Sequence, residues 1–436
     1  MTSQAIRLLS NLIMTRLLIP EMFGVMAIAN IIIVGLAMFS DLGLKQNIIQ
    51  SKRGEDPIFL NTVWSVQIIR GFILGFVCLV FVYVLNVFNE SGLISKDSVY
   101  ASELLPQVLI LLALSPIIQG LESTKLACAN RALYLKRIVT LELVAQLFGL
   151  AFMLTWVYFD QTIWALVVGA IFSGIVKTSL SHLILPGHPN KLSWEKQSFD
   201  EIFRFGKWMF LSSILGFLIN QGDKLLLGGV LSSNSFGLYS IAALLYASLE
   251  GLILKLISNV AFPALGEINR ADPKSVRDKY YKIRFPIDIF CLLIAGFLFC
   301  SGTTTVDLLY DDRYLDSGLM LQVLSLILIV IRFGVAGQLY LVMGKPKIMA
   351  MLMLSRLLFM LILIPLGHQL NGDIGAVWGL VVAYFPGLIL TFFYKIQYGL
   401  IDVKKELGVL PIFLIGLVLG TIFNWAINLL SLNATL

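Results

Sequence analysis

Charged residues are scarce in this chain of 436 residues: only 13% are Asp, Glu, Lys or Arg, whereas 58% are hydrophobic. Soluble globular domains carry about 25% charged residues. So few charges could not cover the surface of a protein of this size in water. The composition therefore excludes an ordinary soluble domain and predicts a protein that is dissolved in a lipid bilayer.

Motifs typical of soluble enzymes are also missing. The four cysteines form no CxxC or Cys/His spacing, the three histidines form no HExxH pair, and no GxGxxG or GxxxxGKS run occurs. We therefore expect no metal, no cofactor and no enzymatic activity. The pI near 9.0 does not indicate nucleic acid as a partner, because the basic residues lie in short loops between apolar runs, where they set membrane topology.

Long apolar runs are abundant, and each is close to the ~20 residues that cross about 30 Å of hydrocarbon as a helix. Lipid offers the backbone no hydrogen-bond partners, so we predict an all-α integral membrane protein with about thirteen spans. The first run begins without a charged segment ahead of it, and we expect a retained helix and not a cleaved signal peptide. The runs cover residues 2–19, 24–44, 62–88, 104–121, 138–159, 162–185, 206–230, 237–261, 284–305, 319–343, 347–367, 374–396 and 408–430.

Basic residues are concentrated in alternate loops between these runs. The loops on one side contain only Lys96 and Arg313 as basic residues, next to several acidic ones. Because short cytoplasmic loops are enriched in Lys and Arg, we predict a cytoplasmic amino terminus and an outer carboxyl terminus. The most basic of the predicted cytoplasmic loops contains Arg270, Lys274, Arg277, Lys279, Lys282 and Arg284.

An internal repeat is visible at two places. The segment LLIPEMFGVMAIA aligns with VLSSNSFGLYSIA, which pairs Gly24 with Gly237, and Trp164 aligns with Trp378 at nearly the same offset. Six predicted helices in each copy give both copies the same orientation, so we predict two six-helix lobes related as parallel repeats, plus one extra C-terminal helix. The predicted domains are an N-lobe at 1–185, a cytoplasmic linker at 186–205, a C-lobe at 206–396 and the extra transmembrane helix at 397–436.

Several segments resemble the polysaccharide transporter family, the O-antigen and exopolysaccharide flippases. Its superfamily also contains multidrug and toxin extrusion transporters and the lipid II flippase. The resemblance covers about residues 2–400, and its segments are TRLLIPEMFGVMAIANIIIVGLAMFSDLGLKQNIIQ, NTVWSVQIIRG, QGDKLLLGGVLSSNSFGLYSIAALL and NVAFPALGEINR. Members usually have twelve or fourteen helices, and thirteen departs from that pattern. The resemblance implies movement of an undecaprenyl-pyrophosphate-linked oligosaccharide from the inner to the outer leaflet of a bacterial plasma membrane, with polysaccharide polymerase or assembly proteins as possible partners.

Charged residues within the spans are candidates for the site of transport. An ionisable side chain near the bilayer centre costs at least ~2.5 kcal/mol, so it normally faces protein or a water-filled cavity. Guanidinium and ammonium groups would hold the pyrophosphate of the implied cargo in a cationic cavity. The candidates are Arg7, Arg70, Lys224, Arg332 and Arg356 for substrate binding, and Asp223 and Glu250 for a coupling ion.

The alternative is structural: some of these basic residues would form ion pairs with Asp223, Glu250 or Glu142 on neighbouring helices. Three other functions also remain open. A multidrug exporter of the same fold should favour acids over bases in its cavity, and a membrane polymerase or ligase would need a larger outer loop than 89–103 or 306–318. The third alternative is a non-transporting component of a polysaccharide assembly complex.

Overall fold

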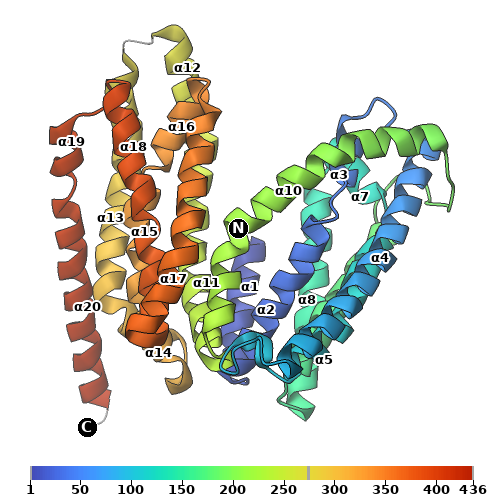
Figure 1. Cartoon of the computed structure of the whole chain (residues 1–436), viewed down its shortest axis with the longest axis horizontal. Helices are drawn as coiled ribbons and strands as arrows, with labels where there is room; N and C mark the ends of the chain where they lie inside the picture. The colour runs from blue at the N-terminus through green and yellow to red at the C-terminus, as the bar shows by residue number, and fades with distance from the viewer. Residues whose placement is uncertain (1, 273–274, 435–436) are drawn as a thin grey trace. The chain divides into compact units, whose positions relative to one another are not determined.

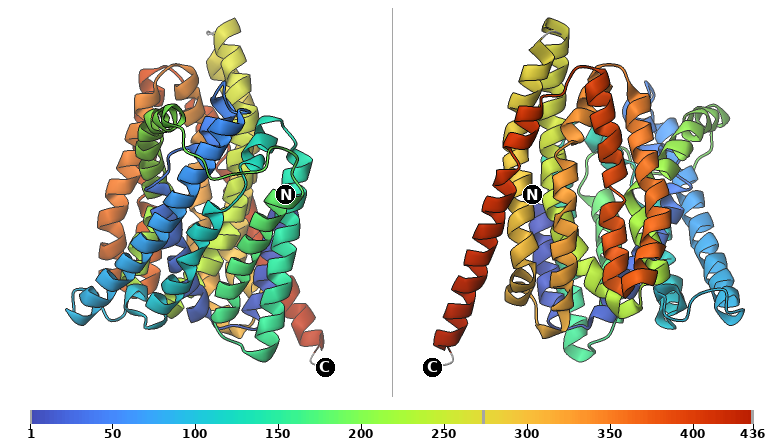
Figure 2. Two further views of the ribbon diagram at one scale, coloured as in Figure 1. Left: turned by 90° about the vertical axis from the view of Figure 1, so that its right-hand side faces the viewer. Right: turned by 60° about the vertical axis from the view of Figure 1, so that its left-hand side comes forward.

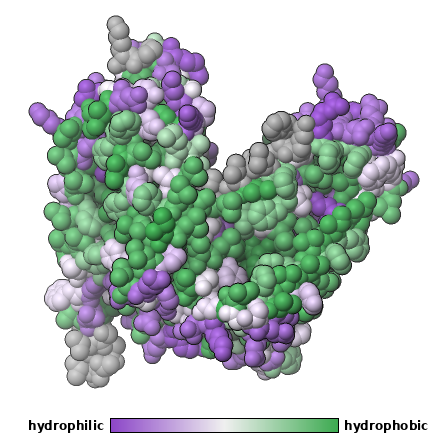
Figure 3. Space-filling model, viewed as in Figure 1, coloured by the Kyte–Doolittle hydropathy of each residue, from purple (hydrophilic) through white to green (hydrophobic). Residues whose placement is uncertain are grey.

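The computed structural model describes residues 2–272 and 275–434, and every regular element in those ranges is a helix (Figure 1). The contacts divide the chain into two compact units, Met1–Asn234 and Ser235–Leu436. In each unit the apolar side chains cover the middle of the helices and the polar ones gather at the helix ends (Figure 3). This distribution fits elements that cross a bilayer.

Proline and polar caps mark the helix starts in the first unit. Pro20 is at the start of α2, and Pro57 begins α4, where Asp56 caps the helix by accepting a hydrogen bond of 3.0 Å from the Ile58 amide. Proline suits this position because its missing N–H has no partner there in any helix. The elements of this unit are α1 (Thr2–Thr15), α2 (Pro20–Met38), α3 (Leu44–Gln50), α4 (Pro57–Glu90), η1 (Val99–Ala101), α5 (Leu104–Leu112), α6 (Leu114–Gly120), α7 (Lys125–Arg131), α8 (Leu135–Phe159), α9 (Trp164–Leu183) and α10 (Lys196–Val230).

Glycine allows close helix packing in this unit. Helices α4 and α6 meet at Gly71 and Gly120, where a Cβ at Gly71 would lie 2.7 Å from the Pro116 carbonyl oxygen. Small residues at helix contacts are typical of membrane proteins, since close approach gives the dispersion energy that the hydrophobic effect cannot supply inside lipid.

The second unit contains three interrupted helices. A π-helical turn, η2, separates α11 from α12, Arg332 and Phe333 separate α15 from α16, and Asn371 and Gly372 are non-helical within α17. Its elements are α11 (Ser233–Leu256), η2 (Ile257–Ala261), α12 (Phe262–Ala271), α13 (Val276–Leu309), η4 (Asp312–Tyr314), α14 (Asp316–Ser325), α15 (Ile327–Ile331), α16 (Gly334–Val342), α17 (Pro346–Val382), α18 (Phe385–Gln397), α19 (Val403–Gly408) and α20 (Pro411–Ala434).

Helix α20 lies at the edge of the second unit and packs along α13 (Figure 2). Glycines line this contact. A Cβ at Gly296 would overlap the Phe413 carbonyl oxygen, and a Cβ at Gly420 would lie 2.6 Å from the Phe297 carbonyl oxygen. The opposite face of α20 exposes large apolar side chains such as Leu414 and Trp425, as expected for a surface in contact with lipid.

The prediction of thirteen spans is not confirmed. Within the described residues, nine helices are long and apolar enough to cross a membrane, or up to ten if the bent pair Leu104–Gly120 and Lys125–Arg131 forms one span. Three features account for the difference. Helix α1 has only 14 residues, α10 carries polar residues within its apolar part, and the predicted spans 347–367 and 374–396 belong to one helical stretch, Pro346–Gln397.

Helix α10 groups with the first unit, whereas the sequence analysis places residues 206–230 in the second lobe. Its buried Ile202 packs in a cluster with residues of α3, α4 and α7. Burial of one such side chain contributes about 1.5–3 kcal/mol. The contacts describe where α10 packs and do not test the repeat, so the two-lobe organisation and its boundaries stay predictions.

The segment that connects α9 to α10, residues 184–195, is held against the first turns of α4 near its end. The Ser193 amide donates to Ser65 Oγ at 3.1 Å, and Ser65 Oγ donates to the Ser193 carbonyl at 2.8 Å. The Glu195 amide donates to Thr62 Oγ1 at 3.1 Å. Two residues of the predicted linker, Ser193 and Glu195, therefore have fixed partners on α4.

An ion-pair network closes this connection. Arg53 donates to Asp56 Oδ2 at 2.6 Å and to Glu195 Oε2 at 2.7 Å. The hydrogen bond from Arg53 lowers the pKa of Asp56, and hydrogen bonds from Ser198 and Arg53 lower the pKa of Glu195. A carboxylate with a lowered pKa stabilises the folded state above its ordinary pKa, and this stabilisation is lost as the pH falls through the lowered value.

Acid should therefore release the connecting segment. Spin labels at Ile58→Cys and Leu192→Cys, both exposed positions, should report one short distance between pH 8 and pH 5. We expect this distance to lengthen only when the pH falls below the ordinary carboxyl range, through the lowered pKa values of the carboxylates that pair with Arg53. Pulsed electron resonance on the labelled full chain measures it.

The matched variants are Arg53→Gln and Arg204→Gln. Arg53→Gln should lengthen the distance already at pH 7, because both carboxylates lose their partner. Arg204 is an exposed cation of α10, and its replacement should leave the distance unchanged. An unaltered distance in Arg53→Gln would show that the backbone hydrogen bonds to α4 alone hold the segment.

Candidate functional site

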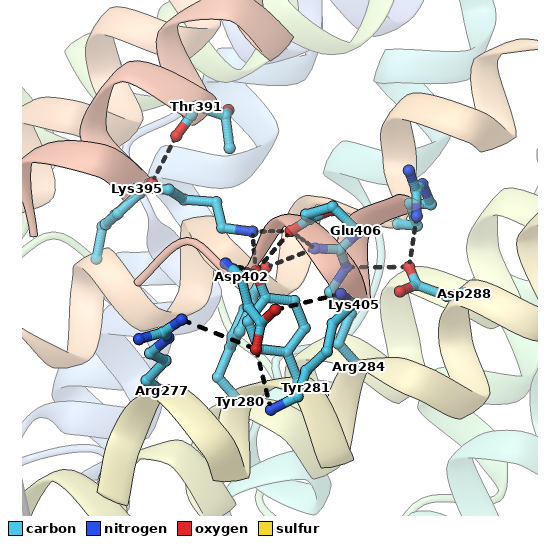
Figure 4. A network of polar contacts seen from close by, with 12 residues as sticks. Arg277, Tyr280, Tyr281, Arg284, Asp288, Thr391, Lys395, Asp402, Lys405 and Glu406 are labelled. Atoms are coloured by element: carbon cyan, nitrogen blue, oxygen red, sulfur yellow. Dashed lines mark hydrogen bonds and ion pairs between the residues drawn. The ribbon is translucent and has the colours of Figure 1, made fainter. Parts of the chain in front are cut away.

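Five charged side chains gather in the interior of the second unit. Arg284 and Asp288 lie one turn apart on α13, Arg332 lies at the break between α15 and α16, and Lys395 and Glu406 come from α18 and α19 (Figure 4). Each is at most 6% exposed. Buried charges need partners of opposite sign because the interior cannot solvate them.

Arg284 is at the centre of this buried charge cluster. It donates to Glu406 with two nitrogens, at 2.7 and 2.9 Å, and its Nε donates to Asp288 Oδ1 at 3.0 Å. Arg332 donates to the same Asp288 oxygen at 3.3 Å. Lys395 Nζ pairs with Glu406 and lies 3.2 Å from the Tyr281 hydroxyl. Two carboxylates thus serve three cations.

Aromatic rings fill the remaining space around the cations. The Phe333 ring lies 4.2 Å from the guanidinium carbon of Arg284 and 4.4 Å from that of Arg332. Lys395 Nζ is 5.0 Å from the ring centroids of Tyr280 and Tyr281. Ring faces attract cations without adding a charge, so they offset part of the one-cation excess.

Arg356 has a different environment. Its guanidinium carbon lies 3.8 Å from the ring centroid of Tyr384, which precedes α18. Its Nε is buried and has no hydrogen-bond partner among the described residues. A buried donor without an acceptor costs about 1–3 kcal/mol, so this group can gain energy from an acceptor that is brought in by a ligand.

Arg70 borders a small polar pocket of the first unit, about 240 Å³ in volume. Its Nε donates to Ser40 Oγ at 3.0 Å and its NH2 group to the Ala37 carbonyl at 2.6 Å. Asp41, on the same pocket, accepts from the Gly43 amide at 2.8 Å and from Ser213 Oγ at 2.9 Å. Arg70 and Asp41 are therefore each held by neutral partners, and Lys45 and Glu122 also line the pocket.

The other predicted residues are distributed over both units. Lys224 of α10 donates to Gln221 Oε1 at 3.0 Å, and its neighbour Asp223 is half-buried on the same helix. Glu250 is half-buried in α11 of the second unit. Arg7 lies in α1, and its side chain is outside the described residues. Within the second unit, the structure brings Arg332 together with the carboxylate of Asp288.

Four members of the buried charge cluster were not predicted from the sequence. Arg284 belongs to the most basic of the predicted cytoplasmic loops, Lys395 lies next to the end of the predicted span 374–396, and neither Asp288 nor Glu406 was a candidate. The i,i+4 spacing of Arg284 and Asp288 could have indicated an ion pair on one helix face. Nothing in the local sequence of Glu406 indicated that it lies in the interior, because its neighbours Lys404 and Lys405 are exposed.

Comparison with known proteins adds a family and a fold. A family model described as polysaccharide biosynthesis protein matches residues 13–319. The lipopolysaccharide biosynthesis protein WzxC of Escherichia coli K12 is 24% identical over 392 residues, which cover 88% of this chain and 76% of that protein. A Shigella flexneri protein provisionally named an O-antigen transporter is 25% identical over 398 residues, 86% of this chain and 90% of its own.

Two solved structures have the same fold. An inward-facing multidrug resistance transporter of the MATE family, in the MOP superfamily, gives a TM-score of 0.68 at 13% identity and covers 91% of this chain and 94% of its own. The lipid II flippase MurJ, in an inward closed conformation, gives a TM-score of 0.68 at 15% identity. The match covers 98% of this chain and 91% of the MurJ chain. The all-α transporter fold and the non-enzymatic class that the sequence predicts are confirmed.

Loss of Glu406 should destabilise the second unit. In Glu406→Gln, Arg284 and Lys395 lose their shared carboxylate while remaining buried, which costs about 3–5 kcal/mol for a buried ion pair. We expect a clear fall in the melting temperature of the purified chain in detergent. Adding Lys395→Met should recover part of that fall, because Arg284 keeps Asp288 as a partner while Lys395 is left without a carboxylate.

Lys405→Gln is the control for this prediction. Lys405 pairs with Asp278 at 2.9 Å but is 43% exposed, and exposed pairs contribute about 1 kcal/mol or less. Equal melting temperatures for Glu406→Gln and Lys405→Gln would contradict a stabilising role of the buried charge cluster.

Proposed function

We propose a function on the premise that this chain belongs to the polysaccharide biosynthesis protein family, whose model matches most of its length. The proposed function is a flippase that moves undecaprenyl-pyrophosphate-linked oligosaccharide, an O-antigen or exopolysaccharide repeat unit, from the inner to the outer leaflet. Movement would occur by alternating access through a cationic cavity. The membrane would be the bacterial plasma membrane, with the amino terminus in the cytoplasm.

The similar proteins support transport over other functions. One relative is named as an O-antigen transporter and another as a lipopolysaccharide biosynthesis protein. One protein of the same fold is named as a lipid flippase and another as a multidrug transporter. Lipid-linked sugar is the cargo that agrees best with the family, and other proteins of polysaccharide assembly are possible partners.

Arg356 is the observation that carries the cationic cavity. A pyrophosphate that crosses the membrane needs hydrogen-bond donors that lipid cannot supply, and guanidinium binds phosphate oxygens through several planar donors. Arg356 has no carboxylate partner among the described residues, and its Nε lacks an acceptor. Its charge is therefore available to a ligand.

The remaining candidates rank below Arg356. Arg332 already donates to Asp288 and lies against Phe333, so we infer a structural role for it first. Arg70 and Lys224 keep neutral partners and can change them when an anion enters. Arg7 stays a candidate from its position in the sequence. Asp223 and Glu250 stay candidates for a coupling ion, which intramembrane acids often bind in transporters.

A multidrug exporter is the alternative with a specific observation in its favour, because a MATE transporter has the same fold. Exporters of organic cations require acids to face the cavity. The candidates within the spans of this chain are mostly basic, which favours an anionic cargo. A non-transporting component of an assembly complex would leave Arg356 without a partner at an energetic cost and with no benefit.

Flipping in proteoliposomes tests the proposal. The wild-type chain should move a fluorescent undecaprenyl-pyrophosphate oligosaccharide, and Arg356→Ala should lower the initial rate about 10- to 100-fold, as expected for the loss of one charge-assisted hydrogen bond of about 1.5–3 kcal/mol. Arg356→Lys should retain an intermediate rate, since the charge remains and the planar donors are lost.

Two further variants separate binding from folding. Arg332→Ala should lower the melting temperature more than Arg356→Ala does, because it leaves Asp288 with one partner fewer. Arg313→Ala changes an exposed loop cation and should affect neither property. Full transport in Arg356→Ala would remove this residue from the cavity, and no transport of such lipids by the wild type would favour the exporter or the assembly component.

A further inference from the structure

A pocket of about 670 Å³ lies between the first turns of α13 and the α19–α20 connection. It belongs wholly to the second unit, and its wall includes Asp288, the partner of the candidate residue Arg332. Figure 4 shows Tyr281, Asp288 and Lys405 in this region. The residues of α13 that line the pocket are Asp278, Tyr281, Lys282, Phe285 and Asp288, and the other side contributes Lys405, Gly408 and Val409.

The rim of the pocket is apolar and accessible. Phe285, which lines the pocket, is 52% exposed, and Val403 and Leu407 of the adjoining helix α19 are each 58% exposed. Large apolar side chains that remain exposed on a membrane helix face acyl chains. A ligand of this pocket therefore has an apolar part beside its polar part.

The charges around the pocket favour an anion. Behind it, the buried charge cluster holds three cations and two carboxylates. In front of it, Lys405 is paired with Asp278 and Asp402. Lys282 is exposed and has no ion-pair partner among the described residues. The local excess is positive, and this end of α13 follows the most basic of the predicted cytoplasmic loops.

We propose that this pocket binds the headgroup of an anionic phospholipid of the inner leaflet. Lys282 donates to the phosphate, Lys405 adds its charge from the opposite wall, and the acyl chains run along Phe285 and Leu407. Basic pockets between membrane helices on the cytoplasmic side bind such headgroups through the same combination of charge and apolar surface. This site does not depend on the proposed transport activity.

The bound lipid would also strengthen the attachment of α19. Tyr281 lines the pocket and donates to Glu406 Oε1 at 2.9 Å, and Asp288 lines it while accepting from Arg284 and Arg332. The wall of the lipid pocket is thus part of the buried charge cluster. A ligand that binds only the folded state raises its stability.

Binding of phosphatidylglycerol to the purified full chain tests this site. Native mass spectrometry measures how much lipid the chain retains, and the melting temperature is followed while the lipid is added. Wild type should prefer phosphatidylglycerol to phosphatidylcholine. Lys282→Ala should weaken phosphatidylglycerol binding about five-fold, the effect expected for one lysine near a lipid phosphate. Phe285→Ala should weaken it as well.

Lys279→Ala is the matched control, because Lys279 is an exposed lysine on the same helix that does not line the pocket. It should bind phosphatidylglycerol as wild type does. Equal losses in the two lysine variants would overturn the proposal in favour of unspecific surface charge. Equal stabilisation by inorganic phosphate would reassign the pocket to a soluble anion. Displacement by undecaprenyl pyrophosphate at far lower concentration would reassign it to the transported lipid.

Discussion

The bidentate pair between Arg284 and Glu406 connects α13 to α19, and much of the second unit depends on it. Both side chains are buried, at 0% and 6% exposure, so neither can exchange its partner for water. Asp288, Lys395 and Arg332 extend this network from three further positions. Because α20 follows α19 directly and packs on α13, the same pair fixes where the last helix begins.

A buried cation needs a partner, and the kind of partner separates structural cations from those available for transport. A guanidinium with a carboxylate, as in Arg332, has its desolvation energy offset within the protein. A guanidinium with only an aromatic neighbour, as in Arg356, keeps donors that a phosphate can satisfy. This distinction ranks the candidates by their partners, and it gives the proposed cationic cavity a specific first residue.

Neutral contacts contribute more to the stability of the first unit than to that of the second. Glycines bring α4 and α6 together, backbone hydrogen bonds hold the connecting segment on α4, and Ile202 fixes the start of α10 in a buried cluster. Ionic contacts in this unit lie near its surface, where Arg53 joins Asp56 and Glu195. Salt screens such surface pairs, whereas it screens the buried pairs of the second unit much less.

The sequence by itself determined that the protein lies in a lipid bilayer, that its fold is all-α and which family it resembles. Each of these depends on the hydropathy of a short stretch of chain or on a short motif. Twenty consecutive apolar residues specify a membrane helix wherever they occur, and the segment around Gly24 carries the family resemblance. The partners of the charges depended on tertiary structure. Arg284 and Glu406 are 122 residues apart, so no hydropathy window contains both. An ion pair is decided by which helices pack together, and only the folded chain brings those helices into contact.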